Sequence, residues 1–294
     1  MQDLDIVIYL LKSKANINHK GIQGLTALHV QLMQKRIAGY KYSERMLNIL
    51  TIRGASVNIK SEHGETPIHV ALKQHFFEVI PDLISRNLEP NITDKDGISY
   101  LMLAAQFGEE DLVESFVDIG VDCSLVDSKG NSALHYACYE NFEPQVVVIK
   151  KSEDMISIAN KKFKVCVYEH TNREKRVNQL LDAGADVNAV TSAGLSPLSV
   201  LLRSRHDDDT MRLLMKLLEY KADPNIGINP LCFASAAMDI PIMKTLLGAG
   251  ADVNKSNTDG ESPLCCCLKN HHRGKTSTVS TYLCLKLNVN SLKQ

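Results

Sequence analysis

Histidine and cysteine side chains are the groups in this chain that could bind a metal. His29, His69 and His135 each stand fourth in a similar phrase, and Cys265, Cys266 and Cys267 precede His271 and His272. Imidazole and thiolate are the ligands that Zn²⁺ prefers in proteins. Both sets are therefore candidate metal sites.

Neither set has the spacing that a zinc site needs. The three phrase histidines fall in different copies of a repeat, so in a stack of helices they would lie about 10 Å or more apart. Consecutive residues of a helix point about 100° apart, so three adjacent cysteines cannot all bind one tetrahedral ion. We expect no metal and no cofactor, and a buried structural role for the cysteine run. A redox, lipid or metal role for that run is the alternative.

Catalytic motifs are also missing from the sequence. It contains no glycine-rich phosphate loop, no Gly-x-Ser-x-Gly, no His-Glu-x-x-His and no Cys-x-x-Cys. Acidic residues cluster at 207–209, but the segment that follows is typical of a helix, whose amino terminus favours negative charge. We therefore predict that the chain is not an enzyme and expect no small-molecule substrate.

A 33-residue period organises the chain. Thr66, Ser99 and Ser132 each open a similar phrase, the first being Thr-Pro-Ile-His-Val-Ala, and they follow one another at 33 residues. The spacing returns in the second half of the chain, at Ser196, Asn229 and Ser262. A fixed period of this length indicates stacked supersecondary units, each contacting only its neighbours.

Each unit has local signals for a loop and two helices. A signature such as Ala-Asp-Val-Asn precedes most phrases by eight residues, with a glycine that supplies the positive φ of a turn. Thr66 followed by Pro67 is typical of a helix start. A second helix, for example over 110–117, ends before Gly120, as expected of a C′ glycine.

These motifs resemble the ankyrin repeat family. Residues 64–71 (Gly-Glu-Thr-Pro-Ile-His-Val-Ala) and 183–188 (Ala-Gly-Ala-Asp-Val-Asn) match its repeat almost unchanged. The resemblance implies an all-α solenoid of helix-turn-helix units with short β-hairpin loops, the fingers, and a concave surface that binds proteins. It also implies that the phrase histidine ties neighbouring units. Four units carry another residue there and are expected to lack the tie: Met102, Ser199, Cys232 and Cys265.

We predict a single array over residues 1–294. It consists of a partial repeat (1–18), repeats starting near residues 19, 59, 92, 125, 189, 226 and 255, and an insertion at about 142–172 within the repeat that starts near 125. The insertion is expected either to bind a partner or to be a loosely packed excursion. A smaller insertion is expected near 36–42, and the finger after Asn225 is short. The ends lack polar caps, so we expect a segment of a longer repeat protein or poor natural caps.

Finger tips are the candidate contact residues by family analogy. Their mixed charges favour a polar, specific protein surface over a phosphate track. Solvated turn residues are the alternative. The predicted partner-binding residues are Lys60, Glu62, His63, Asp94, Lys95, Asp96, Asp127, Lys129, Lys255, Asn257 and Asp259. Thr191 and Ser192 are predicted to form a further finger tip.

Two asparagines carry a separate hypothesis. Asn188 and Asn254 each close a Leu-x5-Asp-Val-Asn sequence, which resembles the sites that an asparaginyl hydroxylase modifies in ankyrin repeats. The alternative is that the asparagine side chain only caps its hairpin.

Three classes of function are compatible with these patterns. A protein-interaction scaffold is preferred; the others are a partner- or substrate-recruiting segment of a larger enzyme, such as a ubiquitin ligase or kinase, and a structural spacer. The net charge of −1 argues against nucleic acid. The start is not that of a signal peptide, and no apolar run approaches the roughly 18 residues of a membrane span. With eight scattered cysteines, we expect reduced thiols and an intracellular location, in the cytoplasm or alternatively the nucleus.

Overall fold

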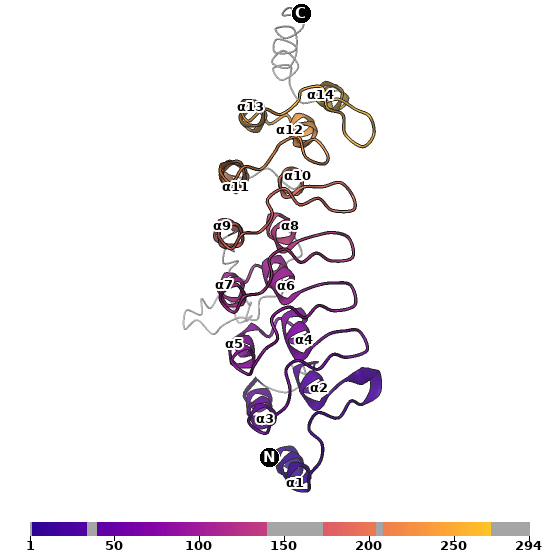
Figure 1. The fold of residues 1–294 in the computed structure, drawn as a ribbon, viewed down its shortest axis with the longest axis vertical. Coiled ribbons are helices and arrows are strands. Elements are labelled where there is room, and N and C mark those ends of the chain that lie inside the picture. Colours follow the sequence, from indigo (N-terminus) through magenta and orange to yellow (C-terminus); the bar gives the residue numbers. More distant parts are fainter. Residues whose placement is uncertain (1, 34–39, 140–172, 204–207, 272–294) are drawn as a thin grey trace, which may run out of the picture.

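The computed structural model describes residues 2–33, 40–139, 173–203 and 208–271, and it forms two columns of helices (Figure 1). The first column consists of α2 (Ala27–Met33), α4 (Pro67–Lys73), α6 (Tyr100–Phe107), α8 (Ala133–Cys138), α10 (Pro197–Arg203), α12 (Pro230–Ala237) and α14 (Pro263–His271). The second column consists of α3 (Tyr40–Ile52), α5 (Ile80–Ile84), α7 (Glu110–Asp118), α9 (Arg173–Asp182), α11 (Asp208–Glu219) and α13 (Ile240–Gly248). The helix α1 (Gln2–Lys12) lies at the amino-terminal end, and two short 3-10 turns are η1 (Ile22–Gly24) and η2 (Phe77–Val79). The predicted all-α repeat class is confirmed.

The fingers project to one side of the first column (Figure 1). Within the described residues they pair through isolated bridges, Thr93 with Ser99 and Val126 with Ser132, and form no longer strands. A finger is therefore a tight loop whose conformation depends on its turn residues rather than on a sheet.

Helix boundaries follow the local signals. Thr66 is the N-cap of α4 with Pro67 as its first residue, where the missing N–H of proline costs no helical bond. Gly120 follows α7 with φ +80°, and the N–H of the next residue, Val121, bonds to the Phe116 carbonyl at 3.0 Å. This left-handed ending is the one predicted from the glycine.

Apolar side chains fill the space between the columns. Leu101 and Leu134 of the first column and Val113 and Phe116 of the second are all 0% exposed. Because α6 packs against α4, α7 and α8, each unit buries its apolar surface mainly on adjacent units. Stability is therefore a sum of nearest-neighbour contacts.

Parts of two predictions lie outside the described residues. The insertion at 142–172 is one, although α8 ends at Cys138 and α9 begins at Arg173, as expected for its flanks. The smaller insertion near 36–42 is mostly outside as well. Within the described ranges, no helix is both long and apolar enough to cross a bilayer.

Candidate partner-binding surface

The phrase histidines join neighbouring fingers. In His69, Nδ1 accepts the backbone N–H of Thr66 at 3.2 Å, and Nε2 lies 3.0 Å from the carbonyl of Ile98. Because Nδ1 accepts, the proton is on Nε2, which donates to the next finger. Burial lowers the pKa of His69 to about 4, so the ring is neutral at pH 7.

His29 and His135 repeat this arrangement. Their Nε2 atoms lie 3.1 Å from the carbonyls of Glu65 and Leu195, and burial lowers both pKa values. The predicted tie is confirmed, and the three rings are committed to hydrogen bonds in different units. Among the described residues, no three His, Cys, Asp or Glu side chains are grouped to hold a metal ion.

The expectation that Ser199 breaks the tie was wrong. Its Oγ donates to the carbonyl of Ile228 at 2.7 Å. The following finger is short, and the carbonyl just before the Asn229 N-cap lies within reach of a serine hydroxyl. Cys232 makes a weaker contact, with Sγ 3.6 Å from the carbonyl of Glu261. Met102 instead accepts the N–H of Ser99 at 3.4 Å within its own unit.

Backbone hydrogen bonds fix the fingers relative to one another. In each bond the N–H of one finger donates to a carbonyl of the preceding finger. The pairs are Glu62 to Gln23 (2.8 Å), Lys95 to His63 (3.0 Å), Ser128 to Asp96 (2.7 Å), Ser192 to Lys129 (2.8 Å) and Ile228 to Gly194 (2.7 Å). These five bonds make a continuous finger row over residues 20–228, in which each tip has a fixed place.

Three of the predicted contact residues hold the fingers from inside. Asp94 and Asp127 are each only 7% exposed. Oδ1 of Asp94 accepts the N–H groups of Asp96 and Ile98, and Oδ1 of Asn257 does the same in its own finger. The prediction misplaced these side chains at the tip, because a carboxylate or amide at this position satisfies the N–H groups of the turn.

Ion pairs and a hydrogen bond also hold the carboxylates of Asp94 and Asp127 in this inner position. The ammonium of Lys73 lies 2.7 Å from Glu65 and 3.0 Å from Asp94. Tyr136 donates its hydroxyl to Asp127 at 2.8 Å. Burial raises the pKa of Asp127, but this hydrogen bond and those from Asn131 and the turn outweigh it, so that the pKa is lowered. These carboxylates are therefore occupied within the protein.

Most of the other predicted tip residues lie on the surface. Lys255 is half-buried, with its ammonium on the carbonyl of Asn225, and Thr191 is buried in the inner position. The exposed members of the predicted set are Lys60, Glu62, His63, Lys95, Asp96, Lys129 and Asp259. Whether they contact a partner stays a prediction.

Apolar finger residues were missed by the sequence prediction. Ile22 is 89% exposed, Val126 49% and Val190 44%. Val126 and Val190 stand two residues after the signature residue, the position that Lys60 takes in its finger. That shared register, just before the inward-pointing residue, was a usable signal because side chains of an extended segment alternate.

Signature asparagines connect units instead of capping their own hairpin. Asn188 donates to the carbonyl of Lys221 at 3.3 Å and accepts the N–H of Asp223 at 2.8 Å. Asn225 repeats this with Gly250 and Asp252, at 2.9 and 2.8 Å. Asn254 is exposed. Hydroxylation of Asn188 or Asn254 stays a prediction.

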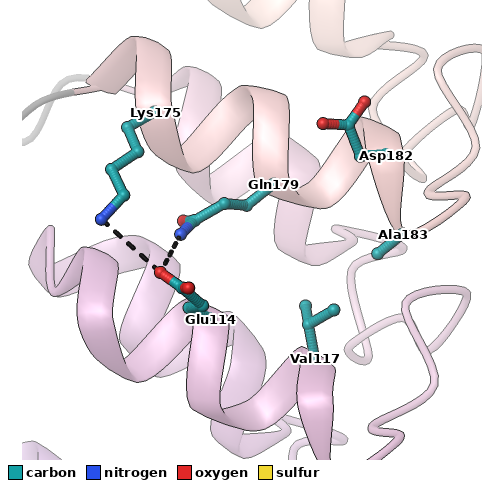
Figure 2. Close-up of a pocket in the computed structure, with 6 residues that line it drawn as sticks. All are labelled: Glu114, Val117, Lys175, Gln179, Asp182 and Ala183. Atoms are coloured by element: carbon teal, nitrogen blue, oxygen red, sulfur yellow. Dashed lines mark hydrogen bonds and ion pairs between the residues drawn. The ribbon is translucent and has the colours of Figure 1, made fainter.

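A groove of about 430 Å³ lies between α7 and α9 in the second column (Figure 2). Three of its polar side chains contact one another: the carboxylate of Glu114 lies 3.6 Å from Lys175 and 3.2 Å from Gln179. The groove is open, and Val117 is its largest apolar side chain. It therefore lacks the convergent polar groups around an apolar pocket that a small-molecule site has.

Known proteins share this architecture. Residues 75–154 match the family model described as ankyrin repeats (3 copies). The crystal structure of the ankyrin repeat domain of Bcl-3 superposes with a TM-score of 0.57 and 22% identity, covering 89% of this chain and 99% of that one.

Sequence relatives cover this chain more fully than it covers them. B-cell lymphoma 3 protein homolog of Mus musculus is 23% identical over 246 residues, 82% of this chain and 47% of that protein. Neurogenic locus notch homolog protein 1 of Danio rerio is 29% identical over 160 residues, 54% of this chain and 6% of that protein. E3 ubiquitin-protein ligase KEG of Arabidopsis thaliana is 23% identical over 258 residues, 80% of this chain and 15% of that protein. The chain thus spans less than half the length of each of these relatives. The match over residues 75–154 and the shared fold together show that the chain has an ankyrin-repeat fold.

Proposed function

We propose that this chain is a non-catalytic scaffold that binds other proteins through its finger tips and the concave side of its first helices. The observation that carries the proposal is the hydrogen-bonded finger row, which presents exposed apolar and charged tips from a fixed backbone. A preorganised surface loses little conformational freedom on binding, so more of the contact energy becomes affinity. Asp94, Asp127 and Asn257 are left out of this surface because they hold the fingers.

Affinity capture with matched variants tests the proposal. The triple variant Ile22→Asp, Val126→Asp and Val190→Asp places charges on three exposed finger positions. The control, Ile52→Asp with Met215→Asp, changes two exposed apolar residues of the second column, which are 72% and 61% exposed. We expect mass spectrometry to identify proteins captured by the wild type and the control but lost with the triple variant.

Two outcomes would contradict this function. If the triple variant captures the same proteins as the wild type, the finger row is not the contact surface. If a properly folded wild-type chain captures no protein above the background of empty resin, the structural-spacer function is favoured. Circular dichroism of each variant separates loss of binding from loss of folding.

A recruiting role within a larger enzyme is the second candidate. The alignment with a ubiquitin ligase over 80% of this chain but 15% of that protein favours it. The coding sequence on either side of this segment tests it: a catalytic domain in the same open reading frame supports the role, and its absence from the complete frame contradicts it.

Asparagine hydroxylation is a separate part of the proposal. Asn188 and Asn254 are proposed as substrates of an asparaginyl hydroxylase. An intact mass without a gain of about 16 Da (one oxygen) after incubation with such an enzyme would contradict this.

We also propose a single array over residues 1–294 in an intracellular compartment, where free thiols such as those of Cys138 and Cys232 persist. Nucleic acid, membrane and small molecules are not proposed as ligands of the finger row.

A further inference from the structure

Helix α9 has a buried arginine where the other second helices have an apolar residue. Counting eight residues back from the glycine that follows α3, α7 and α13 gives Met46, Leu112 and Ile242, which are 8%, 4% and 2% exposed. The same position in α9 is Arg176, which is 5% exposed. Leucine or methionine would fill this space without desolvating a charge, so the arginine is costly for folding.

The first residue of α9 is also basic, where two other second helices have an acidic residue. Eleven residues before the glycine, α7 has Glu109 and α13 has Asp239 as N-cap residues. Carboxylates there are favoured by the helix dipole. In α9 the position is taken by Arg173, only 6% exposed. Two positive groups thus lie in the first turn of a helix, whose own N–H groups also attract negative charge.

Both guanidinium groups are only partly hydrogen-bonded. Arg173 donates from Nη2 to the carbonyl of Cys138, and Arg176 donates from Nη1 to the carbonyl of Gly108 at 3.4 Å. Within the part of the chain that the structure describes, Nε and Nη1 of Arg173 and Nε of Arg176 are buried and have no hydrogen-bond partner. A buried N–H without a partner is costly for folding, because it has lost its hydrogen bond to water.

Surrounding groups stabilise part of this positive charge. The carbonyls of Gly108 and Cys138 lie at the carboxyl ends of α6 and α8, where positive charge is favoured. The pKa of Arg176 is lowered to about 10, chiefly by burial and also by the neighbouring charge of Arg173. The carboxylates of Glu110 and Glu109 act against this lowering. These contacts account for Nη2 of Arg173 and Nη1 of Arg176 and leave the three unpartnered nitrogens unexplained.

We propose that the first turn of α9, with Arg173 and Arg176, is a binding site for a single oxyanion, a carboxylate or a phosphate group. A guanidinium presents its N–H groups in a planar fork that matches both groups. The unpartnered guanidinium donors of the two arginines would then bind the same anion. This site lies at the ends of α6, α8 and α9 and does not depend on the finger row.

Thermal unfolding of the full chain in phosphate, acetate and chloride, at equal pH and ionic strength, tests the site. The variants are Arg176→Leu and, as a control, Lys175→Leu, which removes the same charge one residue away on the side of the groove. We expect phosphate or acetate to raise the Tm of the wild type and the control by about 2–4 °C over chloride. The rise should be lost in Arg176→Leu.

The salt that acts distinguishes the two sources: a shift in phosphate alone assigns phosphate, and a shift in acetate assigns carboxylate. An equal shift in Arg176→Leu would overturn the proposal, because the effect would then be a general salt effect. No shift in the wild type, with Arg176→Leu more stable in every salt, would also overturn it. A change in the Nε–H resonance of Arg176 on adding inorganic phosphate or acetate gives a second readout that needs no variant.

Discussion

Acidification should destabilise the array through His69. The ring is 0% exposed, accepts the N–H of Thr66 at Nδ1 and donates from Nε2 to Ile98. A second proton on Nδ1 would remove the acceptor and place a charge in the core. Burial is the largest cause that lowers the pKa of His69 from 6.5 to about 4.

The sign and size follow from proton linkage. Between pH 6.5 and about 4 the unfolded chain binds a proton at His69 that the folded chain does not, so the free energy of unfolding falls as the pH falls. From pH 7 to pH 5 this one residue removes about 2 kcal/mol. The lowered pKa values of His29 and His135 act in the same direction. Glu109, whose pKa burial raises to about 6, acts in the opposite direction.

Urea unfolding at pH 7 and pH 5 measures the effect. The wild type is compared with His69→Gln and with His63→Gln, which changes an exposed tip histidine. We expect His69→Gln to lose about 2 kcal/mol less than the wild type on acidification, and His63→Gln to match the wild type. Glu109 is common to all three and cancels.

A histidine titration decides the case independently of unfolding. We expect the ring protons of His69 to keep a neutral chemical shift at pH 5. If the resonance titrates near pH 6.5, or if His69→Gln retains the full pH dependence, the assignment of a buried neutral imidazole is refuted.

Three further substitutions test the connections between units, each by its change in the urea-unfolding midpoint. Gly64→Ala should cost about 2–4 kcal/mol, because a Cβ there would lie 2.7 Å from a backbone nitrogen of the next finger. The control Gly54→Ala, with φ +91° and nothing within 4 Å of the added Cβ, should cost only about 1 kcal/mol. Equal losses in the two variants would contradict the close approach at Gly64. Ser199→Ala should cost about 1–2 kcal/mol by leaving the carbonyl of Ile228 without its donor; no loss would show that the tie is not formed. Asn225→Ala should cost about 1–3 kcal/mol because two hydrogen bonds to the next unit are lost; a change below 0.5 kcal/mol would contradict this.

Local signals in the sequence were sufficient for the architecture. The Thr66–Pro67 pair predicts where α4 begins and Gly120 predicts where α7 ends, because N-caps and left-handed turns depend on a few consecutive residues. The 33-residue period places these signals in register. The recurrence of such units along the chain is therefore determined by the sequence itself.

Side-chain direction and partner distance needed the tertiary structure. Neighbouring residues such as Asp94 and Lys95 look equally polar in the sequence, yet one is 7% exposed and the other is on the surface, since the turn aims only one at its own N–H groups. Ser199 keeps a tie because the next finger is short. Arg176 is a charged residue of an ordinary helix in the sequence. Only the packing of α9 against α7 and α8 places it in the core, because burial is decided by neighbouring elements and not by the residue.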